Sequence, residues 1–440
     1  MYKDKWKKLL STKRYGKNNE QDREEYRSDF HKDYDRIVFS SSFRRLGRKT
    51  QVHPMANHDH IHTRLTHSME VSSVGRSLGN HIGAYLQSEG ELPDNITPDD
   101  IASIVQAACL AHDIGNPPFG HAGEYAIRHW FRENQNKLAY DNPHDLKDLT
   151  MFEGNAQGYR VVSKIENNFN QGGLQLTYAT LGTLVKYPWS SGHVNADNNE
   201  KYNFFTSERE EAVEVFRELG LKVGQNLCRH PLSYLMEAAD DICYKILDIE
   251  DALELDMLRF EEVSEIFELL AGNEKSVQQK NDHHHNLTNR NLVIPLRSKA
   301  IENLINQCVV AFKTNYFSIM DGSFQGDLIA HIGDIETIGL KKAKQVTNEN
   351  IFLHQRKIEL EIGAYTTLGN MLDAFVTAIN EIKRGEPSFK SRRLLDLVGQ
   401  KPNIDKLSHH ECYMLVMDQI SGMTDNHATY IANQLAGRGL

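Results

Sequence analysis

The sequence contains few cysteines, and none of them has the spacing of a metal site or a disulfide framework. Only five of the 440 residues are cysteine, and no two form a CxxC pair. Most of them lie in apolar runs of helical pattern, which favours reduced thiols in a hydrophobic core and a cytoplasmic location. The five are Cys109, Cys228, Cys243, Cys308 and Cys412.

Long apolar runs are also absent. No run approaches the roughly 20 residues that a membrane-spanning helix needs, and the basic N-terminal stretch MYKDKWKKLL lacks the apolar region of a signal peptide. We therefore expect no membrane association. With a net charge of −10 and a pI of about 6.1, non-specific binding to nucleic acid is not the default expectation, although a local basic patch is compatible with both values.

Strand–helix alternation, a GxGxxG turn, a P-loop and internal repeats are missing as well. The apolar residues recur instead with the period of helices, so we predict an all-α fold with minor strand or hairpin content. A strand or turn is expected within 322–333, and loops within 190–203 and 277–291. The predicted helices cover 37–52, 65–86, 98–111, 152–167, 174–187, 204–219, 232–255, 350–384 and 407–435.

The most informative stretch is LAHDIGNPPFGHAGE, residues 110–124. It places His112 and Asp113 side by side at the end of an apolar helical run, just before glycine and proline residues that do not belong in a helix interior. His121 and Glu124 follow with i,i+3 spacing, so they share one face if the chain is helical from residue 120. We interpret the stretch as a metal position with an acid/base pair facing it. An ordinary surface pair is the alternative for His121 and Glu124.

Two further segments supply side chains of the metal-ligand type, His67 and Asp240. Two imidazoles and two carboxylates suit Mn²⁺, Mg²⁺ or iron better than a closed thiolate zinc site. A bound cation would also offset the cost of burying the acidic pair at 240–241 among apolar neighbours. Either residue alone is also compatible with a helix cap or an arginine pair. Asp240, Tyr244 and Asp248 are spaced i, i+4 and i+8, which aligns them on one helix face, either toward a ligand or toward solvent.

Several strings resemble the HD-domain deoxynucleoside triphosphate triphosphohydrolases, whose bacterial members are called dGTPases. The H…HD…D pattern is shared by many phosphohydrolases, whereas HDIGNPPFGH and EAADDICY are far more specific. The matching strings are HTRLTHS (62–68), AHDIGNPPFGHAGE (111–124), FEGNAQG (152–158) and YLMEAADDICY (234–244), with FRRLGRKTQV (43–52), LTYATLGTLVKYP (176–188), KYNFFTSE (201–208) and ISGMTD (420–425). The resemblance thus covers nearly the whole chain.

This resemblance implies metal-dependent hydrolysis of dGTP or several dNTPs to deoxynucleoside and tripolyphosphate. Manganese or magnesium is the expected metal, with iron, nickel and cobalt as alternatives. The metal ligands would be His67, His112, Asp113 and Asp240, and the catalytic pair His121 and Glu124. The triphosphate would be met by Arg64, Asn155, Lys186 and Lys201, and the sugar by Gln51, Val52, Tyr244 and Asp248, with Tyr244 leaving no room for a 2′-hydroxyl. Asn116 stands where some members carry a histidine.

The charge pattern, the predicted helices and the resemblance together suggest an organisation and partners. We expect a charged surface arm at 1–35, an HD phosphohydrolase core at 36–255, a helical and loop extension at 256–345, and a C-terminal helical region at 346–440 that packs on the core. A homo-oligomer is expected, with a hexamer as one form. A single-stranded DNA or nucleotide effector is a further expectation, for which the basic cluster Arg384, Lys390, Arg392 and Arg393 is a candidate, with a solvated loop as the alternative.

Two other functions are compatible with the same residues. One is an HD phosphohydrolase of another nucleotide, such as a monophosphate, a cyclic nucleotide or an alarmone. The other is a non-catalytic relative that binds nucleotide or single-stranded DNA, against which the intact His121 and Glu124 pair argues. The alternating His58, His60 and His62 are interpreted as loop histidines near the pocket mouth, and His283 to His285 as a solvated tip.

Overall fold

The computed structural model confirms the predicted all-α fold. It describes residues 1–17, 27–51, 61–140, 142–169, 171–273, 289–397 and 404–438. Within them, the only β-sheet is an antiparallel hairpin of β1 (Lys222–Val223) and β2 (Asn226–Leu227). None of the described helices has the combination of length and apolarity needed to cross a membrane.

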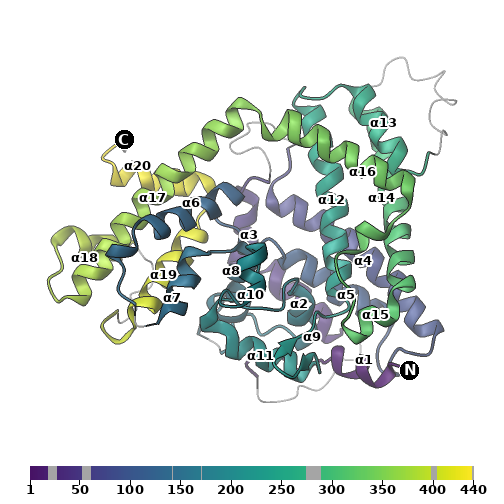
Figure 1. Ribbon diagram of the computed structural model, residues 1–440, viewed down its shortest axis with the longest axis horizontal. Helices are drawn as coiled ribbons and strands as arrows, with labels where there is room; N and C mark the ends of the chain where they lie inside the picture. The colour runs from purple at the N-terminus through teal and green to yellow at the C-terminus, as the bar shows by residue number, and fades with distance from the viewer. Residues whose placement is uncertain are drawn as a thin grey trace.

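The centre of the molecule is the close pair α4 (Arg64–Ser88) and α5 (Pro98–Ala111). Glycines on α4 allow this approach: a Cβ added at Gly79 would lie 2.6 Å from Ala102 Cα. Thr97 and Asp100 form a capping box that starts α5 at the predicted proline. Helices α2 (Asp29–Val38) and α12 (Ser233–Glu254) pack against this pair, as Figure 1 shows.

A second hydrophobic core lies beside the first and joins the C-terminal helices to the middle of the chain. It is built by α6 (Gly120–Glu133), α7 (Pro143–Thr150), α17 (Gln355–Lys383), α18 (Phe389–Asp396), α19 (His409–Ser421) and α20 (Asp425–Leu435). Figure 1 shows these helices together on the left, with α17 running along the top of the molecule. The C-terminal helices therefore pack directly on α6, which carries His121 and Glu124.

The remaining elements complete the two cores. The helices are α1 (Lys3–Leu9), α3 (Ser41–Arg45), α8 (Gly154–Arg160), α9 (Tyr178–Leu184), α10 (Val194–Asn199), α11 (Arg209–Glu218), α13 (Phe260–Leu270), α14 (Asn289–Thr314), α15 (Tyr316–Asp321) and α16 (Asp334–Val346). The short turns are 3₁₀ segments η1 (Leu46–Arg48), η2 (Gln135–Lys137), η4 (Thr206–Glu208), η6 (Leu328–His331) and η8 (Ile404–Lys406), and π-helical segments η3 (Val161–Ile165) and η7 (Thr347–Phe352).

Two predictions for the N-terminal part are wrong. The described part of the arm is not a surface segment, because Trp6 and Leu9 are fully buried and the Trp6 indole donates a hydrogen bond to the Tyr316 hydroxyl over 2.8 Å. The single helix predicted at 37–52 is broken into α2, α3 and η1. Ser40 caps α3 as its residue type favours, but the chain is extended at Lys49.

Other boundaries differ in smaller ways. The 190–203 loop contains the short α10, and the 407–435 helix is divided at Gly422 into α19 and α20. Region 322–333 contains the 3₁₀ segment η6, while the hairpin lies at 222–227. The long helices predicted at 65–86, 98–111 and 232–255 are confirmed as α4, α5 and α12. The boundaries of the four expected regions stay predictions, and most of the 277–291 loop lies outside the described residues.

Candidate active site

The turn that carries His112 and Asp113 begins where α5 ends, at Ala111. Two residues after Asp113, Gly115 lies against the backbone of α8, so that a Cβ at this position would overlap Gly158 N and Gly154 O. Only glycine fits such a close backbone approach. The direction in which the His112–Asp113 turn leaves α5 is therefore set by backbone packing.

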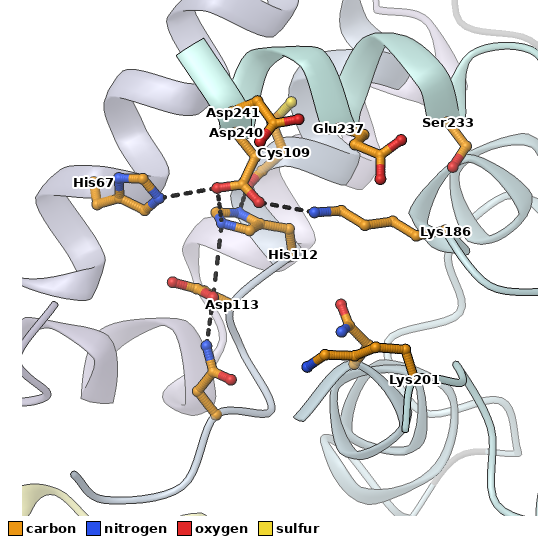
Figure 2. A network of polar contacts seen from close by, with 12 residues as sticks. His67, Cys109, His112, Asp113, Lys186, Lys201, Ser233, Glu237, Asp240 and Asp241 are labelled. Atoms are coloured by element: carbon orange, nitrogen blue, oxygen red, sulfur yellow. Dashed lines mark hydrogen bonds and ion pairs between the residues drawn. The ribbon is translucent and has the colours of Figure 1, made fainter. Parts of the chain in front are cut away.

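Four predicted metal ligands converge from three elements: His67 from α4, His112 and Asp113 from the turn, and Asp240 from α12. The ligand atoms of His67, His112 and Asp113 all lie within 4.8 Å of one another. Asp240 Oδ1 lies 3.2 Å from His67 Nε2 and 3.3 Å from His112 Nε2. Figure 2 shows both imidazoles and Lys186 directed at the Asp240 carboxylate.

The protonation of this cluster suits a divalent cation. His112 Nδ1 is 2.6 Å from the carbonyl of Cys109 and must donate to it, which leaves Nε2 facing Asp240. That Nε2 is buried and forms no hydrogen bond of good geometry within the described structure. Burial opposes ionisation of Asp113, but Arg64 and the two histidines outweigh it and lower its pKa to about 2. Two imidazole nitrogens and two carboxylates are the mixed set that metals such as Mn²⁺ accept.

Three cationic side chains surround the cluster. Arg64 donates to Asp113 Oδ2 over 2.7 Å, and Lys186 donates to Asp240 Oδ2 over 2.7 Å. Lys201 donates to Glu153 Oε1 over 2.7 Å, and Asn155 donates to the same oxygen. Burial opposes the charge on Lys186, but Asp240 outweighs it and raises the pKa of the lysine, so it stays protonated. Positive charge is thus held on two sides of the ligand cluster.

The expected acid/base pair lies on the first turns of α6, as the i,i+3 spacing predicts. Glu124 is buried, and its Oε2 lies 3.4 Å from His121 Nδ1 while its Oε1 accepts a hydrogen bond from Gly154 N over 2.8 Å. Burial would raise the pKa of Glu124, but His121 and Lys201 outweigh it and lower the pKa to about 2. The His121 side chain is 73% exposed, so its other ring nitrogen is open to a ligand.

One cavity of about 610 Å³ joins these groups. Its lining includes the predicted residues Gln51, Arg64, His112, Asp113, His121, Glu124, Asn155, Lys186, Lys201, Asp240 and Tyr244, and also Asn116, whose amide donates to Asp113 Oδ1. His67 is buried against Asp240, and Asp248 lies one turn beyond Tyr244 on α12 without lining the cavity. Val52 lies outside the described residues.

The sequence reasoning missed the contribution of α17 to this cavity. Lys357, Leu360 and Glu361 line its wall, and Lys357 and Glu361 form an i,i+4 ion pair at 3.8 Å. In the sequence such a pair is typical of any solvated helix face. The only signal that could have identified these residues is the tertiary position of α17 beside α6.

Three other predicted features within the described residues do not line this cavity: His62, Asp248 and the basic cluster at 384–393. His62 lies between Asp251, 2.6 Å from its Nδ1, and Glu70, 3.3 Å from its Nε2, while His58, His60 and His283 to His285 are outside the described residues. Asp248 is 3% exposed, and its burial, with the charge of Asp251 nearby, raises its pKa well above the ordinary range. The basic residues Arg384, Lys390, Arg392 and Arg393 are all exposed.

Comparison with known proteins agrees with this geometry. Residues 64–171 match the HD domain model. A deoxyguanosinetriphosphate triphosphohydrolase-like protein of Pseudomonas aeruginosa strain LESB58 is 46% identical, over 98% of this chain and 99% of its own length. A protein of the same description from Synechocystis sp. is 36% identical over 99% of this chain and all of its own. This chain belongs to the dGTP triphosphohydrolase-like family of HD-domain proteins.

Membership in the dGTP triphosphohydrolase-like family confirms the resemblance found in the sequence. A deoxyguanosinetriphosphate triphosphohydrolase of Salmonella paratyphi A is also similar, at 29% identity over 91% of this chain and 92% of its own length. The HD match contains His67, His112, Asp113, His121 and Glu124, whereas Asp240 and Tyr244 lie outside it on α12. The site of this family member therefore combines the HD region with a later helix.

Proposed function

We propose that the protein is a divalent-metal-dependent hydrolase that converts deoxynucleoside triphosphates, dGTP or several dNTPs, to deoxynucleoside and tripolyphosphate. The observation that carries the proposal is the convergence of a four-residue ligand cluster, three cationic side chains and the His121–Glu124 pair on one cavity of about 610 Å³. The names of the similar proteins from Pseudomonas aeruginosa and Salmonella paratyphi A refer to the same type of substrate.

The charges around the ligand cluster match a triphosphate. His67, His112, Asp113 and Asp240 would hold a divalent ion, which would supply a Lewis acid for the α-phosphate. Arg64 and Lys186 already carry positive charge at the edge of the cluster, and Lys201 carries it on the side of Glu153. Phosphoryl transfer depends mainly on positioning and neutralisation of charge, which these side chains provide.

The His121–Glu124 pair on α6 supplies the proton that the leaving 5′ oxygen needs. Water attacks the α-phosphorus, the bond from phosphorus to the 5′ oxygen breaks, and that oxygen must gain a proton as the deoxynucleoside leaves. His121 is the residue open to the cavity that can move this proton, and Glu124 orients its ring and stabilises its charged form. The Glu124 carboxylate also accepts a hydrogen bond from Gly154 N, which fixes the side chain that orients the His121 imidazole.

The nucleoside end of the cavity lies along α12. Tyr244 lines it one turn after Asp240, which suits a ring that packs on deoxyribose and leaves no space for a 2′-hydroxyl. Gln51 lines the cavity with a buried Oε1 that forms no hydrogen bond to the described residues, so it can accept one from the 3′-hydroxyl. Asp248 is proposed for the same hydroxyl.

Product analysis tests this reaction. The protein is incubated with each of the four dNTPs and with GTP, in the presence of Mn²⁺ or Mg²⁺, and the products are separated by anion-exchange chromatography. Tripolyphosphate and deoxynucleoside in equal amounts are expected. Pyrophosphate or orthophosphate as the first product would point instead to another HD phosphohydrolase, and metal binding without turnover would point to a non-catalytic relative.

Variants test the assigned roles. His121→Ala is expected to abolish turnover and retain metal, because the ring is exposed and is not in the ligand cluster, whereas Asp113→Ala is expected to lose both. His129→Ala is the matched control, since His129 is exposed on the same helix and contacts Tyr365 outside the cavity. Normal turnover in His121→Ala, or normal metal content in Asp113→Ala, would contradict the assignment.

The other expectations stay predictions. These are the homo-oligomer, the hexamer, the single-stranded DNA or nucleotide effector and the cytoplasmic location. The metal is proposed as manganese or magnesium.

A further inference from the structure

We propose that Asp425, in the C-terminal string ISGMTD, is a positioning residue of the active site that fixes the turn presenting His121. The inference rests on the proposed function for its kinetic readout only. The string is 300 residues from His121 in the sequence and has no role in the reaction described above.

Asp425 bridges two segments that line the cavity. It is the first residue of α20 and is 3% exposed. Its Oδ1 accepts a hydrogen bond from the backbone N–H of Phe119 over 3.0 Å. Its Oδ2 accepts from both the N–H and the hydroxyl of Thr50, over 3.0 and 2.8 Å. One carboxylate thus connects the residue beside Gln51 with the residue two positions before His121.

The turn at Phe119 needs such support. Phe119 has φ 64° and Gly120 has φ 58°, so two successive residues are left-handed, and the first of them is not glycine. A conformation of this kind is strained and persists only where the surroundings fix it. Phe119 is also the N-cap of α6, and its side chain caps no helix N–H. The orientation of the first turn of α6 therefore depends on external contacts.

A second contact supports the same turn. The ammonium group of Lys49 is buried and donates to the carbonyl of Asn116 and to the carbonyl of Ser421, each over 2.6 Å. Lys49 and Thr50 belong to the string 43–52, while Ser421 and Asp425 belong to the string 420–425. The two strings therefore hold the 116–119 turn together through Lys49, Thr50, Ser421 and Asp425, none of which is hydrogen-bonded to the ligand cluster.

The position of His121 is sensitive to this arrangement. The imidazole projects from the first turn of α6 and is exposed, so its place relative to the ligand cluster is set by the backbone and by Glu124. A displacement of about 1 Å at a reacting group can cost on the order of 100-fold in rate. Asp425 is thus expected to affect the chemical step, and the metal ligands should be unaffected.

The test compares Asp425→Asn with Thr424→Ala. The amide keeps the size of the side chain but has one acceptor oxygen, so it cannot hold both Phe119 and Thr50. Thr424→Ala removes the N-cap of the same helix, whose Oγ1 accepts from His427 N, and leaves the two bridging contacts in place. Turnover of dGTP, metal content, thermal midpoint and hydrogen–deuterium exchange of a peptide covering 116–121 are measured for both variants and for the parent.

Asp425→Asn is expected to lower kcat by about ten- to 100-fold, with KM changed by less than about threefold and metal content unchanged. Exchange at 116–121 should be faster than in the parent. Thr424→Ala should lower the thermal midpoint and leave kcat and this exchange unchanged. Thr50→Val, which removes only the hydroxyl contact, should show a smaller loss of kcat and keeps the test available if Asp425→Asn does not fold.

Equal kcat losses in Asp425→Asn and Thr424→Ala would overturn the inference, because stability alone would then account for them. Unchanged exchange at 116–121 in Asp425→Asn and Thr50→Val would also overturn it. Absence of dNTP turnover in the parent would instead reject the proposed function, and the exchange comparison would still decide whether Asp425 fixes the turn.

Discussion

The substitution Arg160→Met should destabilise the protein strongly, because Arg160 is the central cation of a buried network. Its guanidinium donates to both oxygens of Asp418, each over 2.8 Å, and also to Glu208. Arg160 is 7% exposed and Glu208 1%. Burial opposes the charge on Arg160, but the two carboxylates outweigh it and raise the arginine pKa further. Since Asp418 belongs to α19, this network fastens the C-terminal helices to α8.

Removing one partner of a buried ion pair costs roughly 3–5 kcal/mol, because the remaining charges are left uncompensated. The entropy of unfolding is about 2.1 cal/mol/K per residue, which for 440 residues gives roughly 0.9 kcal/mol per kelvin if the chain unfolds as one unit. The thermal midpoint of Arg160→Met should therefore fall by about 3–5 °C in differential scanning calorimetry. Arg384→Met, at an exposed arginine, is the control and should stay within about 0.5 °C. A shift in Arg160→Met no larger than in the control would refute the reasoning.

Three further outcomes are expected. Burial opposes the charge on His62, but Asp251 and Glu70 outweigh it and raise the pKa of the imidazole from 6.5 to about 10. The stability that this ion pairing gives the folded protein is therefore complete below pH 6.5 and is lost as the pH rises toward 10. The thermal midpoint should fall less steeply from about pH 7 to about pH 9.5 in His62→Gln than in the parent. Manganese at about 100 times its Kd should raise the parent midpoint by about 3 °C and that of Asp113→Asn not at all. Tyr244→Ala should raise GTP turnover relative to dGTP by about tenfold, measured as kcat/KM; unchanged discrimination would remove Tyr244 from sugar selection.

The helices that the sequence predicted well are those whose signals are local. Helix α5 has a capping box, a proline at its start and a continuous apolar run, and α4 and α12 have long apolar stripes. The 37–52 prediction failed at two places: α2 ends at Val38 and Ser40 starts a new helix, and at the C-terminal end Thr50 is hydrogen-bonded to Asp425, 375 residues away, a partner that no local pattern encodes. The prediction of a surface arm failed because Trp6 is buried against Tyr316, which lies in the distant α15.

Most of the candidate site could be predicted because its motifs are also local in the sequence. The paired His112 and Asp113 at a helix end, and the i,i+3 pair on α6, carry chemical meaning within a few residues of sequence. The wall formed by Lys357, Leu360 and Glu361 carries none, because only the packing of α17 against α6 brings these ordinary helix residues to the cavity. The cost of the left-handed turn at Phe119 is likewise invisible until the backbone is known.

The short helix α8 has a consequence for how precisely the site can work. One face of its first turns receives Gly115, next to the ligand turn, and its leading amide at Gly154 holds Glu124. The ligand turn and the His121–Glu124 pair are therefore both positioned by the first residues of α8. A displacement of α8 is therefore expected to move the ligand turn and Glu124 together, which would preserve the distance between the metal ligands and the His121–Glu124 pair.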